Sequence, residues 1–388
     1  MTEYSQRALL PEGLHDDLMP TAEAEARVTQ HLTACFLGHG YDLVAPPLIE
    51  FENSLLAGPG AARSDGMFRL MDPLGQATLA LRSDITPQIA RIAATRLAQA
   101  PRPLRLAYSG QVLRVRGNQL HPERQFTQTG AELIGVDTTA ANAEVILLAV
   151  EALEGMGVEG LSVDLIMPAL VPAVCDGFDM DGDTAKKVRA ALDAKDVGAL
   201  SVAGADAEKL FKRLLAAAGP ADQAFEMLTG LDLPAAAAEK CGHLWDTCAL
   251  VREAAPGLKV TVDPGEFRGF RYHTGVCFSF FSAQGHRELG RGGRYLIDSV
   301  GNGGGGESAT GFTIAIDTLL QVLAEPQPAR RVYVPSGTPA TQLRELRAQG
   351  WRTVAALDTS ADDAAEAARL GCGHLFQGGV VVALAGKK

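Results

Sequence analysis

The chain contains 388 residues, 47% of them hydrophobic, and its 35 Lys and Arg against 46 Asp and Glu give a formal net charge of −11. This length allows one large domain with an attachment, or two domains, around a sizeable packed core. The negative charge argues against non-specific binding to a nucleic-acid backbone, which depends on Lys and Arg displacing counterions. The longest apolar stretches, 145–150 and 380–385, are too short to cross a bilayer.

The N-terminal segment and the cysteines both predict a cytoplasmic protein. Residues 1–7 contain no basic segment leading into an apolar one, so no export signal is expected. Six cysteines are scattered, mostly in apolar surroundings, as in proteins whose thiols stay reduced and buried. Cys241, His243 and Cys248 lie close together, but Cys-x-His-x4-Cys matches no common structural zinc site, so no bound metal is expected.

The first 160 residues are predicted to form strands with flanking helices. An amphipathic helix is expected over 21–38, because Ala24, Val28, Leu32 and Phe36 recur at helical spacing. Further helices are predicted over 87–98 and 140–156, and strands over 41–45, 68–70, 77–81, 104–109, 111–116 and 125–134. Strands of this density without βαβ alternation predict an α+β fold built on an antiparallel sheet.

The composition changes between about residues 164 and 264, where Ala-rich helices studded with Lys and Glu predict a helical insertion. These helices are expected over 184–194, 206–218, 221–228 and 235–253, after which strands resume at 267–281, 287–297 and 311–316, followed by a helix over 317–323. We therefore predict a core of residues 1–323, a linker over 324–330 and a small α/β module over 331–388. Within that module, strands are expected at 331–335, 353–357 and 380–384 and helices at 339–348 and 361–370.

The stretch 266–275 is the richest candidate for a ligand site. Strand alternation would place Arg268, Phe270 and Tyr272 on one face, which suits a pocket that reads a carboxylate and a ring. His273 would usually be structural, and in this company a binding role is an equal alternative.

A second candidate is the glycine-bent segment 290–295. Its Arg291, Arg294 and Tyr295 suit one wall of a small-ligand site, although such a segment taken alone is more often an ordinary turn. The glycine-rich run 302–306 lacks the Lys-Ser/Thr pair of a phosphate-binding loop and predicts a flexible connection.

Polar residues also fall where the core is expected. Asp84 and Thr86 stand at a strand-to-helix junction, where they would serve as helix caps or face a ligand. Gln128 and Glu132 share one face of a predicted strand. Burying both would be costly unless they bind a ligand or each other.

Taken in order, these segments resemble the catalytic core of class II aminoacyl-tRNA synthetases, and specifically the histidyl-tRNA synthetase family. The resemblance runs from residue 11 to about 323, with 41–50 similar to the first class II motif, 108–128 to the second, 311–320 to the third and 268–275 to the histidine-specific signature. It implies that 41–50 forms a homodimer interface.

Two departures from that family decide the expected function. The resemblance assigns Arg114 to the α-phosphate, and this residue is kept. Arg116 stands where a glutamate reads the adenine amine, and Thr318 stands where an arginine stacks on adenine. Each loss would remove a contact worth about 1–3 kcal/mol. ATP activation is therefore expected to be disabled, with no catalytic residue and no cofactor.

The pocket that the resemblance implies for histidine is better preserved. Asp84 replaces a glutamate that holds the amino group, and His273 replaces a tyrosine, while the other positions match. The predicted histidine-binding residues are Asp84, Thr86, Arg114, Gln128, Glu132, Arg268, Tyr272, His273 and Tyr295.

This combination is similar to the regulatory subunits of two-component ATP phosphoribosyltransferases. That resemblance implies a short catalytic subunit as partner, histidine as effector and a homodimer core within a hetero-oligomer. A transfer-RNA partner is not expected, because the C-terminal module is shorter than the family's anticodon-binding domain. The alternatives are an active histidyl-tRNA synthetase with unusual motifs, and a free-standing histidine-sensing or tRNA-binding pseudo-synthetase.

Overall fold

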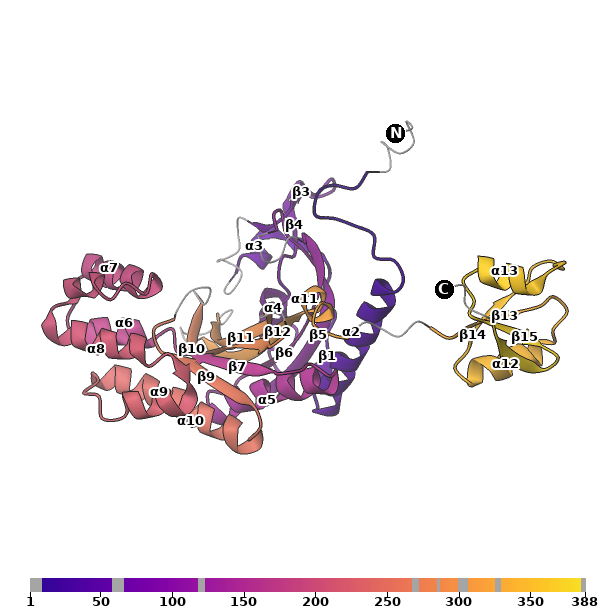
Figure 1. The fold of residues 1–388 in the computed structure, drawn as a ribbon. Coiled ribbons are helices and arrows are strands. Elements are labelled where there is room, and N and C mark those ends of the chain that lie inside the picture. Colours follow the sequence, from indigo (N-terminus) through magenta and orange to yellow (C-terminus); the bar gives the residue numbers. More distant parts are fainter. Residues whose placement is uncertain are drawn as a thin grey trace. The chain divides into compact units, whose positions relative to one another are not determined.

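The computed structural model describes residues 9–57, 66–117, 123–266, 272–284, 287–298, 306–324 and 329–384. The chain divides into two compact units, residues 1–323 and 324–388 (Figure 1). Among the described residues, none of the helices is both long enough and apolar enough to span a membrane.

The first unit is built on a nine-stranded sheet with the order β1-β5-β6-β12-β11-β10-β7-β9-β8. Neighbouring strands are antiparallel except in the pairs β1–β5 and β7–β9, which are parallel. The predicted α+β class is confirmed, and the two parallel pairs are additions to it. The strands are β1 Asp42–Leu43, β5 Leu104–Leu113, β6 Gln125–Ile134, β7 Ser162–Ile166, β8 Gly219–Pro220, β9 Lys259–Asp263, β10 His273–Ser282, β11 Arg287–Ile297 and β12 Glu307–Ala315.

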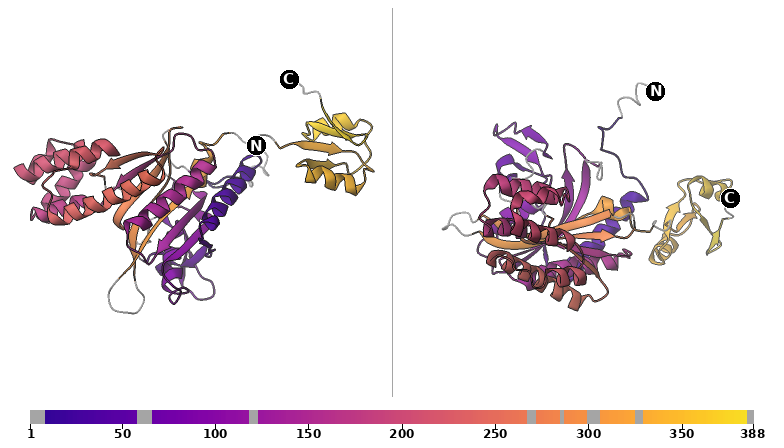
Figure 2. Two further views of the ribbon diagram at one scale, coloured as in Figure 1. Left: turned by 90° about the horizontal axis from the view of Figure 1, so that it is seen from below. Right: turned by 60° about the vertical axis from the view of Figure 1, so that its left-hand side comes forward.

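Both faces of this sheet are covered, and β6 shows how. Its Ala131 and Leu133 pack with the helices α2 (Thr21–Gly38) and α5 (Thr139–Gly155), which lie side by side (Figure 2). Its Phe126 and Ile134 belong to a second cluster that includes Ile89 of helix α4 (Thr86–Ala94). The side chains of Gln128 and Glu132 therefore share the α4 face, because alternate residues of a strand point the same way.

The segment between β7 and β9 is mostly helical. Its helices are α6 Leu170–Gly177, α7 Gly182–Asp193, α8 Ala205–Ala216, α9 Ala221–Leu228 and α10 Ala235–Ala254, with a 3-10 turn at Ala199–Ala203. The predictions missed α6, which contains a proline, and also missed β7 and β9 at the two ends of the segment. The long α10 packs against α5 and α6, so the helical segment shares the core of the sheet.

A smaller three-stranded sheet, β2-β4-β3, is joined to α4 by hydrogen bonds from Gln88 and Arg91 to Glu50. It comprises β2 Ile49–Phe51, β3 Arg69–Met71 and β4 Thr78–Leu81, with α3 Glu52–Leu55 following β2. The two strands predicted at 104–109 and 111–116 are one continuous strand, β5. Gly110 lies within it because the Arg82 side chain occupies the space: a Cβ there would lie 2.2 Å from Arg82 Nη2.

The second unit is a four-stranded sheet of order β14-β13-β15-β16 with two helices. Its elements are β13 Arg331–Val334, α12 Ala340–Ala348, β14 Arg352–Ala355, α13 Asp363–Arg369, β15 His374–Gln377 and β16 Val380–Ala383. Strand β15 was not predicted; like β14, it pairs with β13 in parallel. Two small clusters form the core, one around Trp351 and the other around Tyr333.

Candidate functional site

The first turn of α4 is fixed by two polar side chains. Asp84 Oδ1 accepts a hydrogen bond from the backbone N–H of Thr86 at 3.3 Å, and Gln128 Oε1 accepts one from the N–H of Ile85 at 3.0 Å. The helix-cap interpretation was wrong in detail: Ile85 is the N-cap residue, and Thr86 is the first residue of the helix. Both donors would otherwise be unsatisfied in a buried helix start.

Glu132 is the centre of a buried network. Its Oε1 accepts a hydrogen bond from the Thr86 hydroxyl at 3.1 Å, and its Oε2 accepts one from the Tyr295 hydroxyl at 3.1 Å. The pKa of Glu132 is raised to about 8, mainly by burial. The hydrogen bonds from Tyr295 and Thr86 lower this pKa, and the negative charge of Asp84 raises it further. Glu132 is 1% exposed, so the carboxyl group is predominantly protonated near neutral pH when no cation accompanies it.

Tyr108 completes the network, and the sequence analysis did not select it. Its hydroxyl lies 3.3 Å from Thr86 Oγ1 and 2.7 Å from Thr313 Oγ1. Two strand glycines make room for these groups. A Cβ at Gly311 would lie 1.8 Å from Glu132 Oε2, and a Cβ at Gly130 would lie 2.5 Å from the Tyr108 hydroxyl oxygen.

Aromatic rings of β10 and β11 border this network. The Tyr272 ring stacks on His273 with centroids 4.1 Å apart, and it meets Tyr295 edge-on at 5.9 Å. The structure therefore brings Tyr272, His273 and Tyr295 together. Arg268 lies outside the described residues.

The two arginines of segment 290–295 do not join the site. Arg294 is buried and donates to Asn142 Oδ1 at 2.7 Å and to the Val136 carbonyl at 2.8 Å, so it fastens β11 to the start of α5. Arg291 pairs with Glu288 at the surface. Of this segment, which lies within strand β11 and is not a turn, only Tyr295 therefore reaches the network.

The positions implied for ATP contacts are arranged differently. The Arg114 guanidinium carbon lies 4.6 Å from the centroid of the Phe126 ring, in a cation–π contact. Arg116 is exposed beyond the end of β5. Thr318 lies in helix α11 (Ile316–Leu320), where it is 2% exposed.

A second polar chain supports the segment before α4, and the sequence analysis also missed it. Arg82 donates to the Gln111 carbonyl at 2.8 Å and to Gln88 Oε1 at 3.2 Å. Gln88 in turn donates to Glu50 Oε1 at 2.8 Å, and Arg91 donates to Glu50 Oε2 at 2.9 Å. These bonds hold Asp84 and Thr86 against β6, so the network rests on a fixed backbone.

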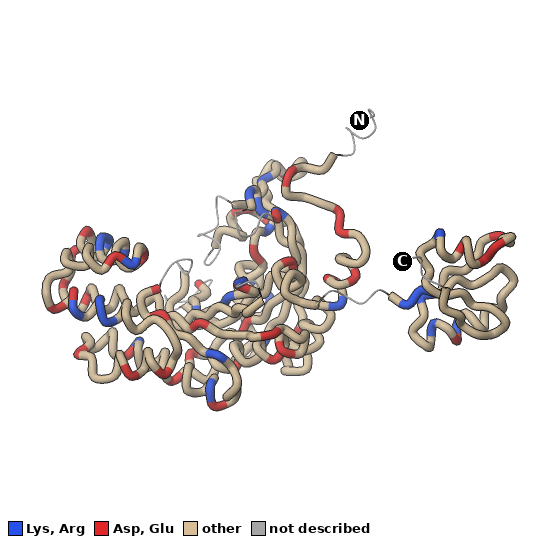
Figure 3. Tube along the Cα trace, viewed as in Figure 1, with Lys and Arg blue, Asp and Glu red and all other residues tan. Residues whose placement is uncertain are grey.

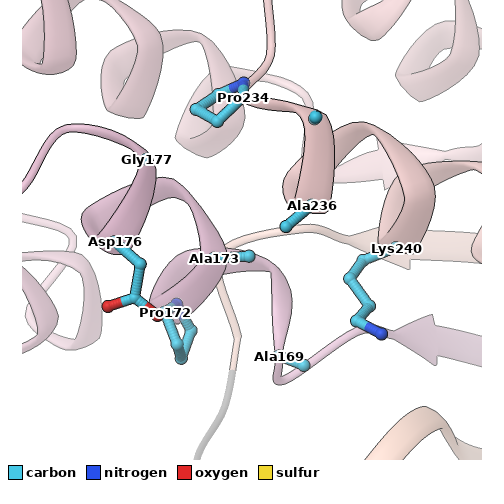
Figure 4. A pocket seen from close by; sticks show the side chains of 9 residues that line it. Ala169, Pro172, Ala173, Asp176, Gly177, Pro234, Ala236 and Lys240 are labelled. Atoms are coloured by element: carbon cyan, nitrogen blue, oxygen red, sulfur yellow. The ribbon is translucent and has the colours of Figure 1, made fainter.

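A separate hollow of about 480 Å³ lies in the helical segment, between α6 and the start of α10 (Figure 4). Its lining is mostly alanine and proline, with two charged side chains, Asp176 and Lys240. Acidic and basic residues are interspersed over these helices (Figure 3). The hollow has no buried polar cluster like that around Glu132, so its chemistry differs from that of the network.

Known proteins resemble this chain along most of its length. The family model described as histidyl-tRNA synthetase matches residues 13–319. An ATP phosphoribosyltransferase regulatory subunit of Paramagnetospirillum magneticum is 53% identical, covering 96% of this chain and 97% of its own length. The protein of the same description from Rhodospirillum centenum is 50% identical, covering 96% and 95%.

Solved structures agree with this fold. A Bacillus halodurans structure described as an ATP phosphoribosyltransferase regulatory subunit/histidyl-tRNA synthetase superposes with a TM-score of 0.80 at 25% identity, covering 93% of this chain and 96% of that one. Histidyl-tRNA synthetase from a Nostoc species gives a TM-score of 0.74 at 17% identity, covering 95% and 90%, and shows the shared fold alone.

Proposed function

The chain belongs to the family of ATP phosphoribosyltransferase regulatory subunits, and from that premise we propose that it regulates a catalytic partner in response to histidine. It acts as a non-catalytic subunit that associates with a short-form ATP phosphoribosyltransferase catalytic subunit. The first step of histidine biosynthesis then depends on this association. Histidine, the end product of the pathway, inhibits the activity of the assembled enzyme.

The observation that carries this proposal is the buried network around Glu132. A carboxyl group at 1% exposure, held by Thr86 and Tyr295, is costly to maintain in a protein core without a ligand. The nearby Asp84 and Gln128 add a second carboxylate and an amide. This set suits the ammonium group and the polar ring of an amino acid such as histidine.

Binding of histidine at this network is coupled to loss of a proton from the Glu132 carboxyl group. A bound ammonium near Glu132 favours the ionised carboxylate, because an opposite charge lowers the pKa of a carboxyl group. Without a cation beside it, the Glu132 carboxyl group has a pKa of about 8. Histidine binding therefore releases a proton in neutral solution and tightens as the pH rises toward 8.

Regulation requires histidine to bind one quaternary arrangement better than another. The network is a suitable sensor because it joins α4, β6 and β11, so a ligand between them shifts several elements at once. A coupling of about 1–3 kcal/mol would change the partner's activity by roughly one to two orders of magnitude.

The homodimer core is part of the same proposal. Exposed apolar side chains are concentrated near the edge strand β1 and on β2, at Leu43, Leu48, Ile49 and Phe51. An apolar edge of this kind favours pairing with a second copy. Ile49→Glu together with Phe51→Glu is expected to shift the chain from dimer to monomer in analytical ultracentrifugation.

The test is the activity of the short catalytic subunit with and without this chain, titrated with histidine. The proposal expects activation by the chain and inhibition by histidine. Arg268→Ala and Gln128→Ala are expected to lower the sensitivity to histidine while assembly persists. Normal inhibition in both variants would place the effector elsewhere, and failure of the two subunits to associate would refute the proposal.

A further inference from the structure

A cysteine, a histidine and a glutamate lie together where the end of α2 packs on α5. Cys35 is in the last turn of α2, His39 immediately follows the helix, and Glu151 is on α5. One donor atom from each lies within 4.8 Å of the other two. Within the described ranges this is the only group of at least three Cys, His, Asp or Glu side chains with such spacing.

The His39 ring is already oriented as in a metal ligand. Its Nδ1 lies 3.0 Å from the Cys35 carbonyl oxygen, and its Nε2 lies 3.2 Å from Glu151 Oε2. A proton on Nδ1 bonded to a backbone carbonyl leaves the Nε2 lone pair free to bind a cation. Metal-binding histidines are commonly fixed by this kind of bond.

The distances are close to those of a tetrahedral site. Zinc bonds of about 2.0–2.1 Å to nitrogen and about 2.0–2.2 Å to a carboxylate place the two ligand atoms about 3.4 Å apart. His39 Nε2 and Glu151 Oε2 are separated by 3.2 Å. The sulfur of Cys35 lies within 4.8 Å of both atoms.

An ion pair between His39 and Glu151 does not by itself account for the cluster. His39 and Glu151 side chains are 39% and 65% exposed, and pairs this exposed contribute little to stability. A divalent cation would bind Cys35 as the thiolate, because a coordinated thiol loses its proton.

We propose that Cys35, His39 and Glu151 form a binding site for a zinc-class divalent cation, with water as the fourth ligand. Binding replaces the S–H bond of Cys35 by a metal–sulfur bond and releases the proton to solvent. No metal was expected from the sequence because Cys241, His243 and Cys248 match no common zinc spacing. Glu151 lies more than a hundred residues after His39, so the present cluster is not visible as a sequence motif.

The consequence is a second link between α2 and α5. Tyr41, just beyond His39, already donates to Glu144 Oε1 of α5 at 3.0 Å. A cation at the proposed site fixes the preceding turn to the same helix, next to the edge strand β1. Zinc is therefore expected to raise the thermal midpoint of the chain, since it binds the folded state selectively.

The test uses the full chain, stripped of metal by a chelator and then titrated with ZnCl2 or CoCl2. We expect one equivalent to bind, with a near-ultraviolet thiolate-to-cobalt charge-transfer band. Cys35→Ser should abolish that band, and His39→Ala and Glu151→Gln should each weaken zinc binding by about tenfold or more. His243→Ala on α10 and Glu226→Gln on α9 change exposed side chains on other helices and should bind like the unaltered chain.

The outcomes are decisive in either direction. Absence of saturable one-to-one zinc binding would overturn the proposal, as would equal affinity in the unaltered chain and in Glu151→Gln. Circular dichroism checks that each variant is folded. If Cys35→Ser fails to fold, the exposed His39 and Glu151 variants still decide the outcome.

Discussion

The network around Glu132 and the two positions Arg116 and Thr318 lie in the same fold but are built differently. The first joins α4, β6 and β11 through hydrogen bonds among residues that are at most 6% exposed. The second places an exposed arginine at a loop and a threonine in the core. The fold therefore retains a buried polar network around Glu132, whereas the two positions expected to recognise adenine carry an exposed arginine and a buried threonine.

The largest expected effect is on the pH dependence of the free energy of unfolding, which tests whether the buried network differs from the exposed Arg116. The folded-state pKa of Glu132, about 8, lies above its ordinary value of 4.5, so its stabilising contribution is full below about pH 4.5 and is lost as the pH rises through 8. Relative to Glu132→Gln, the unaltered chain should lose up to about 1.4 kcal/mol per pH unit between pH 5 and 8. Urea unfolding across this range measures the difference, and parallel curves for the two proteins would contradict the buried, protonated carboxyl group.

Filling the space beside Glu132 should have the next largest effect. Gly311→Ala would place a Cβ 1.8 Å from Glu132 Oε2, so the free energy of unfolding should fall by about 3 kcal/mol. Gly242→Ala is the matched control, since nothing lies within 4 Å of its Cβ and it stands in α10. That variant should gain about 0.5–1 kcal/mol in the same urea experiment. Equal effects at both glycines would show that the network tolerates an added methyl group.

Removing the amide of Gln128 should have a moderate effect. Gln128→Ala leaves the buried Ile85 N–H without its acceptor, at a cost of about 1–3 kcal/mol in the free energy of unfolding. The same variant should bind histidine more weakly by calorimetry. Gln321→Ala changes an exposed side chain and serves as the control. A loss of stability without a change in histidine affinity would separate the network from the ligand.

Substitution of Arg116 should have the smallest effect. Arg116→Ala removes an exposed side chain, so its free energy of unfolding should stay within about 0.5 kcal/mol of the unaltered chain. Histidine inhibition of the assembled enzyme should also be unchanged. A large loss of inhibition would mean that Arg116 contacts the partner or the effector.

The sequence predicted most elements of the fold because their patterns were local. Strands β6 and β11 and helix α2 were predicted with the bounds that the structure shows, from alternation and helical spacing. Strands β7 and β9 were missed because their pairing joins residues about a hundred positions apart, across the helical segment. Such a parallel pair leaves no turn signal to recognise.

The candidate site was predicted less completely, for a similar reason. The polar residues of β6 were found because two polar side chains on one face of an apolar strand are unusual. Tyr108 was missed because a tyrosine in a strand is ordinary, and its contacts with Thr86 and Thr313 come from distant segments. The glycines at 130 and 311 were the available signal, since a glycine inside a strand often marks close approach of another group.

The most direct test measures histidine binding and histidine-dependent ATP–pyrophosphate exchange on one preparation of the purified chain. The account predicts saturable binding of histidine by calorimetry, together with exchange no faster than a blank without protein. Robust exchange would contradict it, because the chain would then activate histidine despite Arg116 and Thr318.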